Sequence, residues 1–135
     1  MMQEILDEVA YLFVEQFDNL YGVLTDRTDV KRIRRSADVG EAEMYSVAVS
    51  VFGDKIDDIL IGAARDAMGY IAYVDETWIP ENTMDKKTTL EIATLHLESL
   101  KKILHMAQEN DCNSIKEIRR ILTEAEIRLQ HLEEK

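Results

Sequence analysis

Four aspartates lie in the stretch DKIDDILIGAARDAMGY, residues 54–70, and their carboxylates are the first candidates for chemistry in this chain. On a helix, Asp54, Asp58 and Asp66 approach one face. Carboxylate oxygens suit Mg²⁺ or Mn²⁺, which proteins hold through one or two carboxylates together with substrate phosphates. The spacing therefore predicts a candidate magnesium site. The alternative, which we favour, is a solvated helix face backed by small residues that let another helix pack closely.

The segment from Asp66 to Tyr70, DAMGY, has acidic residues upstream and resembles the metal-binding helix of the all-α nucleoside triphosphate pyrophosphohydrolases of the MazG type. The resemblance implies a magnesium-dependent enzyme that acts on nucleotides. Those enzymes pair an E-x-x-E helix with an E-x-x-D helix, whereas here Ala63 stands three residues before Asp66. Glu41 and Glu43 are two residues apart instead of three. We keep this enzyme as an alternative hypothesis, and only under it is Mg²⁺ a cofactor.

A basic island interrupts the acidic chain. Its five cations are Arg27, Lys31, Arg32, Arg34 and Arg35. Arginine suits bidentate contact with phosphate, so the island could hold substrate phosphates in an enzyme or meet an acidic partner in a binding module. It lacks the interleaved aromatic residues of a protein that binds single-stranded nucleic acid. We favour compensation of the surrounding carboxylates over a ligand site.

The formal net charge of −11 is distributed unevenly. Residues 1–26 carry six acidic side chains and no basic one, and residues 41–85 carry ten acidic and two basic. Residues 86–135 carry nine of each. A chain this acidic repels phosphate backbones, so direct binding of nucleic acid is disfavoured and a basic protein partner is favoured.

Other features restrict the setting in which the chain works. Cys112 is the only cysteine, which excludes an intramolecular disulfide. The start, MMQEILDEVAYLF, lacks the basic region of a secretory signal, and no apolar stretch reaches the length of about 18 residues that crosses a membrane. We expect a soluble, cytoplasmic protein with no membrane contact. The sequence contains no glycine-rich phosphate loop or G-x-S-x-G motif, so we favour a binding protein over an enzyme.

Apolar residues spaced three and four apart predict the helices that position these side chains. The helical stripes run through residues 5–24, 41–76, 86–109 and 115–132. Residues 41–76 would form about 54 Å of helix, so we expect a break at Gly53–Asp54. The predicted fold is an all-α bundle of about four to five helices in a single domain, 1–135. Large apolar residues alternate with small ones in YSVAVSVF, which is the period of a strand. An α+β fold with short strands near 44–52 and 70–79 is therefore the alternative.

The last helix carries the most regular stripe. SIKE suggests a capping box, with Ser114 as N-cap and Glu117 three residues later. The stripe then follows a 3-4-3-4-3 spacing through Ile115, Ile118, Leu122, Ala125, Leu129 and Leu132. Because a narrow seam at this spacing is typical of coiled-coil pairing, residues 114–134 are a candidate dimerisation element. Packing against the helix of residues 86–109 is the alternative.

Three functional hypotheses follow. The leading one is a small acidic helical protein that acts through protein–protein contacts, as a regulator, inhibitor or adaptor. It would bind a basic partner surface, in the extreme case by imitating the charge of nucleic acid, and would form a homodimer without a cofactor. The second is the magnesium-dependent nucleotide hydrolase. The third is a helical bundle that binds a small molecule in a pocket lined by Tyr70, Tyr73 and Trp78.

Overall fold

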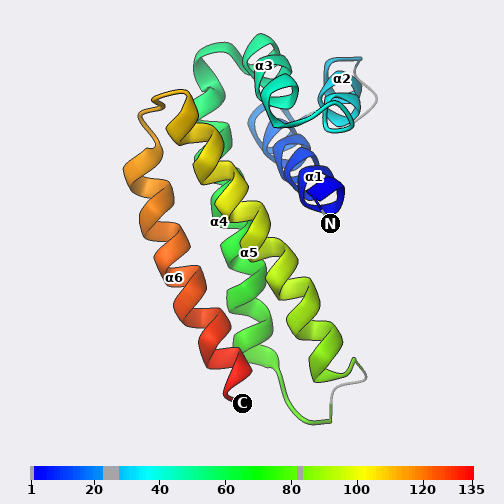
Figure 1. The fold of residues 1–135 in the computed structure, drawn as a ribbon, viewed down its shortest axis with the longest axis vertical. Coiled ribbons are helices and arrows are strands. Elements are labelled where there is room, and N and C mark those ends of the chain that lie inside the picture. The colour runs from blue at the N-terminus through cyan, green and yellow to red at the C-terminus, as the bar shows by residue number, and fades with distance from the viewer. Residues whose placement is uncertain (1, 23–27, 82–83) are drawn as a thin grey trace.

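A computed structural model of the chain describes residues 2–22, 28–81 and 84–135. The helices of these ranges are α1 (Met2–Tyr21), α2 (Thr28–Ser36), α3 (Glu41–Phe52), the short 3₁₀ helix η1 (Gly53–Lys55), α4 (Ile56–Thr77), α5 (Lys86–Glu109) and α6 (Ile115–Glu133) (Figure 1). The all-α prediction is confirmed. The described ranges contain no strand, so the α+β alternative with strands near 44–52 and 70–79 is wrong.

Residues 41–52 form the helix α3 rather than a strand because the side chains that pack into the core follow the helical period. This helix buries Met44, Ala48 and Phe52, which lie four residues apart and so share one helix face. The break between α3 and α4 occurs where it was predicted. Gly53 has a φ of 58°, a conformation that glycine adopts without steric cost.

Helices α4, α5 and α6 pack lengthwise, with α4 and α6 running in the same direction and α5 in the opposite one (Figure 1). Helix α1 packs against α4 and α5, and α2 and α3 gather beside it at one end of the molecule. The N-terminal end of α1 lies beside the middle of α5. The other end of the bundle is therefore built from three helices rather than four.

The regular stripe of α6 is part of the chain's own core. Ile118, Ala125 and Leu132 are fully buried, and Leu129 is nearly so. Ile115 and Leu122 are partly buried and pack against the same core. The structure thus assigns the predicted dimerisation seam to packing within the chain, against α4 and α5, because one helical period serves an internal neighbour as well as a second copy.

The start of α6 is also held differently from the capping-box prediction. The Ser114 side chain makes no cap hydrogen bond; instead, its backbone N–H donates to Oδ1 of Asp57 at 3.2 Å. Glu117 pairs with Arg65 at 3.2 Å and with Arg120. A carboxylate in the first turn of α4 therefore fixes the beginning of α6.

The opposite end of α6 is anchored by a buried carboxylate of α4. Asp75 accepts a hydrogen bond from Nδ1 of His131 at 2.6 Å, and Nη1 of Arg128 lies 3.5 Å from its other oxygen. Lys135 donates to the Asp75 carbonyl oxygen.

In the described ranges, no helix is long and apolar enough to span a lipid bilayer.

Candidate functional site

The structure separates the three aspartates that were predicted to bind magnesium. Asp54 lies in η1 and Asp58 in the first turn of α4, and both are exposed. Asp66 follows two turns later, about 12 Å from Asp58 along the helix axis. Among the described residues, no three His, Cys, Asp or Glu side chains are grouped so that they could hold a metal ion. The described residues therefore do not bring Asp54, Asp58 and Asp66 together into one three-carboxylate group, and the magnesium site stays a prediction.

Asp66 instead links α4 to α1. It accepts a hydrogen bond from Nε2 of Gln16 at 2.5 Å. Burial raises the pKa of Asp66; the hydrogen bond from Gln16 acts in the opposite direction, and the charge of Glu15 adds to the rise. The close approach of Gln16 is possible because Gly62, one turn earlier on α4, has no side chain there.

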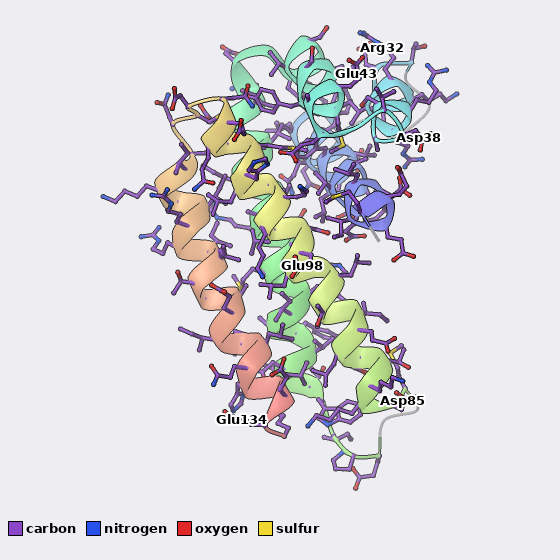
Figure 2. The ribbon with its side chains drawn as sticks, in the orientation of Figure 1. Arg32, Asp38, Glu43, Asp85, Glu98 and Glu134 are labelled. Atoms are coloured by element: carbon purple, nitrogen blue, oxygen red, sulfur yellow. The ribbon has the colours of Figure 1, made fainter. Side chains whose placement is uncertain are left out.

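The basic island lies on α2. Lys31, Arg32, Arg34 and Arg35 are exposed, and Arg32 lies on the outer side of the helix (Figure 2). Arg27 lies outside the described residues. Within the ranges that the structure describes, none of the four cations has a carboxylate within 4 Å. The compensation favoured from the sequence is thus not made there by direct ion pairs.

An acidic stripe runs along the outer face of α1. We define it as Asp7, Tyr11, Glu15 and Asp18, residues three to four apart that share one side of the helix. Gln3 donates to Asp7 at 3.0 Å, and the Tyr11 hydroxyl donates to Glu15 at 2.8 Å. That hydrogen bond raises the pKa of Tyr11. No cation of the described residues lies within 4 Å of the three carboxylates.

Several carboxylates of the other helices have cationic partners. Glu41 of α3 lies 3.0 Å from Nζ of Lys102 and 2.6 Å from Nδ1 of His105. Asp75 lies near two cations at the end of α6, Arg128 at 3.5 Å and Lys135 at 3.7 Å. The acidic stripe differs from these because its three charges have one sign and, among the described residues, none of them forms an ion pair within 4 Å.

A small hollow opens at the C-terminal half of the acidic stripe. Its volume is about 270 Å³, and its lining residues are Tyr11, Val14, Glu15, Asp18, Asn19, Arg34 and Asp66. Helices α1, α2 and α4 all contribute to it. Three carboxylates and a single arginine face this space, so the hollow can accept a cationic side chain.

A partly buried ion pair joins α1 to α5. Nε2 of His96 lies 3.0 Å from Oε1 of Glu8, and Nδ1 of His96 lies 3.0 Å from the Ile92 carbonyl oxygen. A carbonyl and a carboxylate both accept hydrogen bonds, so both contacts are made together only by the protonated ring, in which both nitrogens donate. Tyr70 of α4 stacks on this ring, with 4.1 Å between the ring centroids.

The surroundings of His96 have opposing effects on its pKa. Burial acts to lower the pKa of His96. The hydrogen bonds to Glu8 and to the Ile92 carbonyl, together with the Glu8 charge, outweigh burial and raise the pKa above its ordinary value of 6.5. Sequence reasoning missed this pair because no local spacing connects Glu8 and His96.

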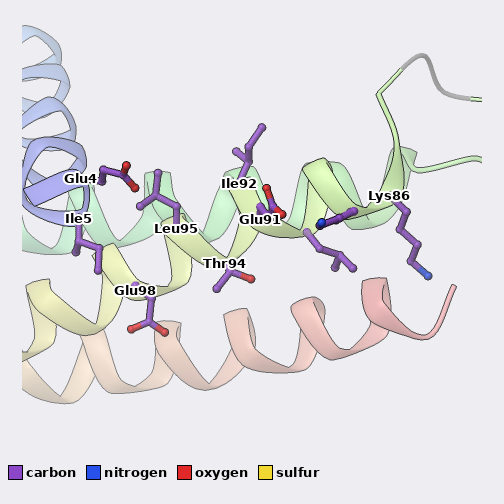
Figure 3. A pocket seen from close by; sticks show the side chains of 10 residues that line it. Glu4, Ile5, Lys86, Glu91, Ile92, Thr94, Leu95 and Glu98 are labelled. Carbon is purple, nitrogen blue, oxygen red and sulfur yellow. The ribbon is translucent and has the colours of Figure 1, made fainter. Parts of the chain in front are cut away.

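An apolar groove of about 880 Å³ lies along α5, next to the N-terminal end of α1 (Figure 3). Its apolar lining residues are Ile5, Leu90, Ile92 and Leu95, and its polar ones are Glu4, Lys86, Lys87, Glu91, Thr94 and Glu98. The aromatic residues predicted to line a ligand pocket are not among them. Tyr70 stacks on His96, Tyr73 is exposed, and Trp78 packs partly buried against the core.

Comparison with known proteins finds no relative of this chain. The chain matches no protein-family model, and neither the curated proteins nor the solved structures give a significant match.

Proposed function

We propose that this protein acts by binding a basic protein partner, as a regulator, inhibitor or adaptor, and that the acidic stripe of α1 is the binding face. The observation that carries the proposal is the run of carboxylates at Asp7, Glu15 and Asp18. Asp7 is exposed and Glu15 and Asp18 are partly exposed; all three charges have one sign, and none has a cation within 4 Å in the described ranges. Such a surface raises the association rate with an oppositely charged protein.

The hollow beside the stripe supports a more specific mode of contact. A lysine or arginine of the partner would enter between Glu15, Asp18 and Asp66, where charge-assisted hydrogen bonds are stronger than at an open surface. Tyr11, half exposed in the middle of the stripe, supplies an aromatic contact. Tyrosine and arginine are enriched among the residues that dominate binding energy at protein interfaces.

The experiment compares two variants that lose the same amount of charge. The stripe variant carries Asp7→Asn, Glu15→Gln and Asp18→Asn. The control variant carries Glu124→Gln, Glu126→Gln and Glu133→Gln, three exposed positions on α6. The two variants and the unmodified protein are immobilised separately, and the proteins that bind to each are quantified at low and at high salt.

We expect the unmodified protein and the control variant to retain the same basic proteins, and the stripe variant to lose them. A fluorescent oligolysine peptide provides a defined probe, and its affinity should fall with added salt. Equal retention by the stripe variant and the control variant would show that net charge, rather than the face of α1, governs binding.

A further inference from the structure

The apolar groove on α5 exists because α1 covers only part of the surface between α4 and α5. The N-terminal end of α1 lies beside the middle of α5, so the first half of α5 has no fourth helix against it (Figure 1). Ile92 and Leu95 remain partly exposed there, and Ile5 of α1 lines the same groove (Figure 3). An apolar surface with a charged rim is typical of a protein interaction site.

Charges of opposite sign lie at the two ends of this groove. Lys86 and Lys87 lie at the start of α5, and Glu98 lies about 18 Å further along the helix. Lys86 donates to the Glu133 carbonyl oxygen of α6, whereas Lys87 is exposed and has no carboxylate within 4 Å among the described residues. Glu98 holds Lys101 at 3.2 Å in an exposed pair, which contributes little to stability.

We propose that the groove binds a second copy of this chain, with α5 packed antiparallel to α5 around a twofold axis near Ile92. In this register Lys87 faces Glu98 of the second copy, and Leu90 faces Leu95. The central Glu91 faces Thr94, whose hydroxyl can donate to it. Each pair occurs twice, as a twofold interface requires.

The order of charges along α5 favours a second copy of the chain in the groove, with the two α5 helices antiparallel. A parallel pair of α5 helices would place each basic end against the other basic end, at an energetic cost. The antiparallel pair places Lys87 of each copy against Glu98 of the other. The groove therefore carries its own complement, which a partner of another sequence would have to supply independently. This surface is separate from the acidic stripe, so the inference does not rest on the proposed function.

The affinity should be modest, because one helix and the end of another form a small interface. Interfaces at the small end of the range are typical of weak, reversible association, so we expect a dissociation constant between about 10 µM and about 300 µM. Sedimentation velocity on the full chain, from about 1 µM to about 1 mM, covers this regime. The unmodified protein should change from monomer to dimer across the series.

A charge exchange tests the register. Lys87→Glu alone and Glu98→Lys alone each create two like-charge contacts, and each should weaken association by about tenfold. The double variant Lys87→Glu/Glu98→Lys restores opposite charges and should restore the dissociation constant to within about threefold. Glu109→Lys, an exposed change on α5 outside the groove, should leave association unchanged.

The apolar lining residues provide a second test. Leu95→Glu should give a monomer at every concentration, with circular dichroism confirming that the bundle remains folded. A monomeric unmodified protein at about 1 mM would overturn the proposal. A dimer that persists in folded Leu95→Glu, or one whose charge exchange gives no recovery, would place the interface elsewhere on the molecule.

Discussion

Glu8→Gln tests the ion pair that holds α1 against α5. The side chains of Glu8 and His96 are 17% and 14% exposed, so the pair is largely shielded from water. A hydrogen bond between charged groups contributes about 1.5 to 3 kcal/mol, and removal of one partner from a fully buried pair costs about 3 to 5 kcal/mol. Because water still reaches this pair, we expect the variant to lose about 2 kcal/mol of unfolding free energy at mildly acidic pH.

The unfolding free energy lost in Glu8→Gln should depend on pH, and the titration of His96 sets the direction. Its pKa in the folded protein is raised above the ordinary value of 6.5, so the folded state binds the proton more tightly than the unfolded state. The resulting stabilisation is complete below pH 6.5 and disappears as the pH rises through the folded pKa. The difference between the two proteins should therefore shrink with rising pH, since a neutral His96 can accept a hydrogen bond from the side-chain amide that replaces the Glu8 carboxylate.

Urea unfolding followed by circular dichroism, at intervals from about pH 5.5 to pH 8.5, measures this difference. The control is Glu109→Gln, which removes an exposed pair with His105 at 3.3 Å. It should change stability by less than about 0.5 kcal/mol at every pH. A Glu8→Gln deficit that stays constant or grows towards alkaline pH would refute the assignment of a protonated His96.

Three further outcomes follow from the packing. Gly69→Ala should stabilise the protein by about 0.5 to 1 kcal/mol in urea unfolding, because an added Cβ meets nothing within 4 Å and alanine favours helix. Gly62→Ala should give no such gain, because its Cβ would collide with the side-chain amide of Gln16; the gain should appear when Gln16→Ala is also present, as a double-mutant cycle would show. Asp75→Asn should cost about 1 to 3 kcal/mol and accelerate amide exchange at the end of α6, because His131 loses its carboxylate partner.

The sequence predicted the helices well because helical period and chain breaks are local properties. The break at Gly53 and the start of α5 at Lys86 both lie where composition and spacing indicated. The alternation in residues 44–52 was misleading because small and β-branched residues fit either period. The four-residue spacing of the side chains that α3 buries decided between them.

The neighbours of each helix could not be predicted, because a stripe shows that a face is buried but not what covers it. The α6 stripe packs within the chain, although its spacing suits a dimer equally well. Likewise, the N–H of Ser114 is bonded by Asp57, a residue far away in sequence. The sequence placed the acidic charge correctly on the first helix, but only the structure shows the hollow beside Glu15 and Asp18.

The order of the helices also affects how the chain folds during synthesis. Helix α1 is made before α4 and α5, the helices that cover its apolar side, and these are completed only at Glu109. At a synthesis rate of about 5 to 20 residues per second, the apolar face of α1 stays exposed for on the order of 4 to 18 seconds before α4 and α5 can pack on it. Exposed apolar segments aggregate during such intervals, and nearby like charges oppose this. The carboxylates of α1 would thus oppose aggregation of the nascent chain during this interval.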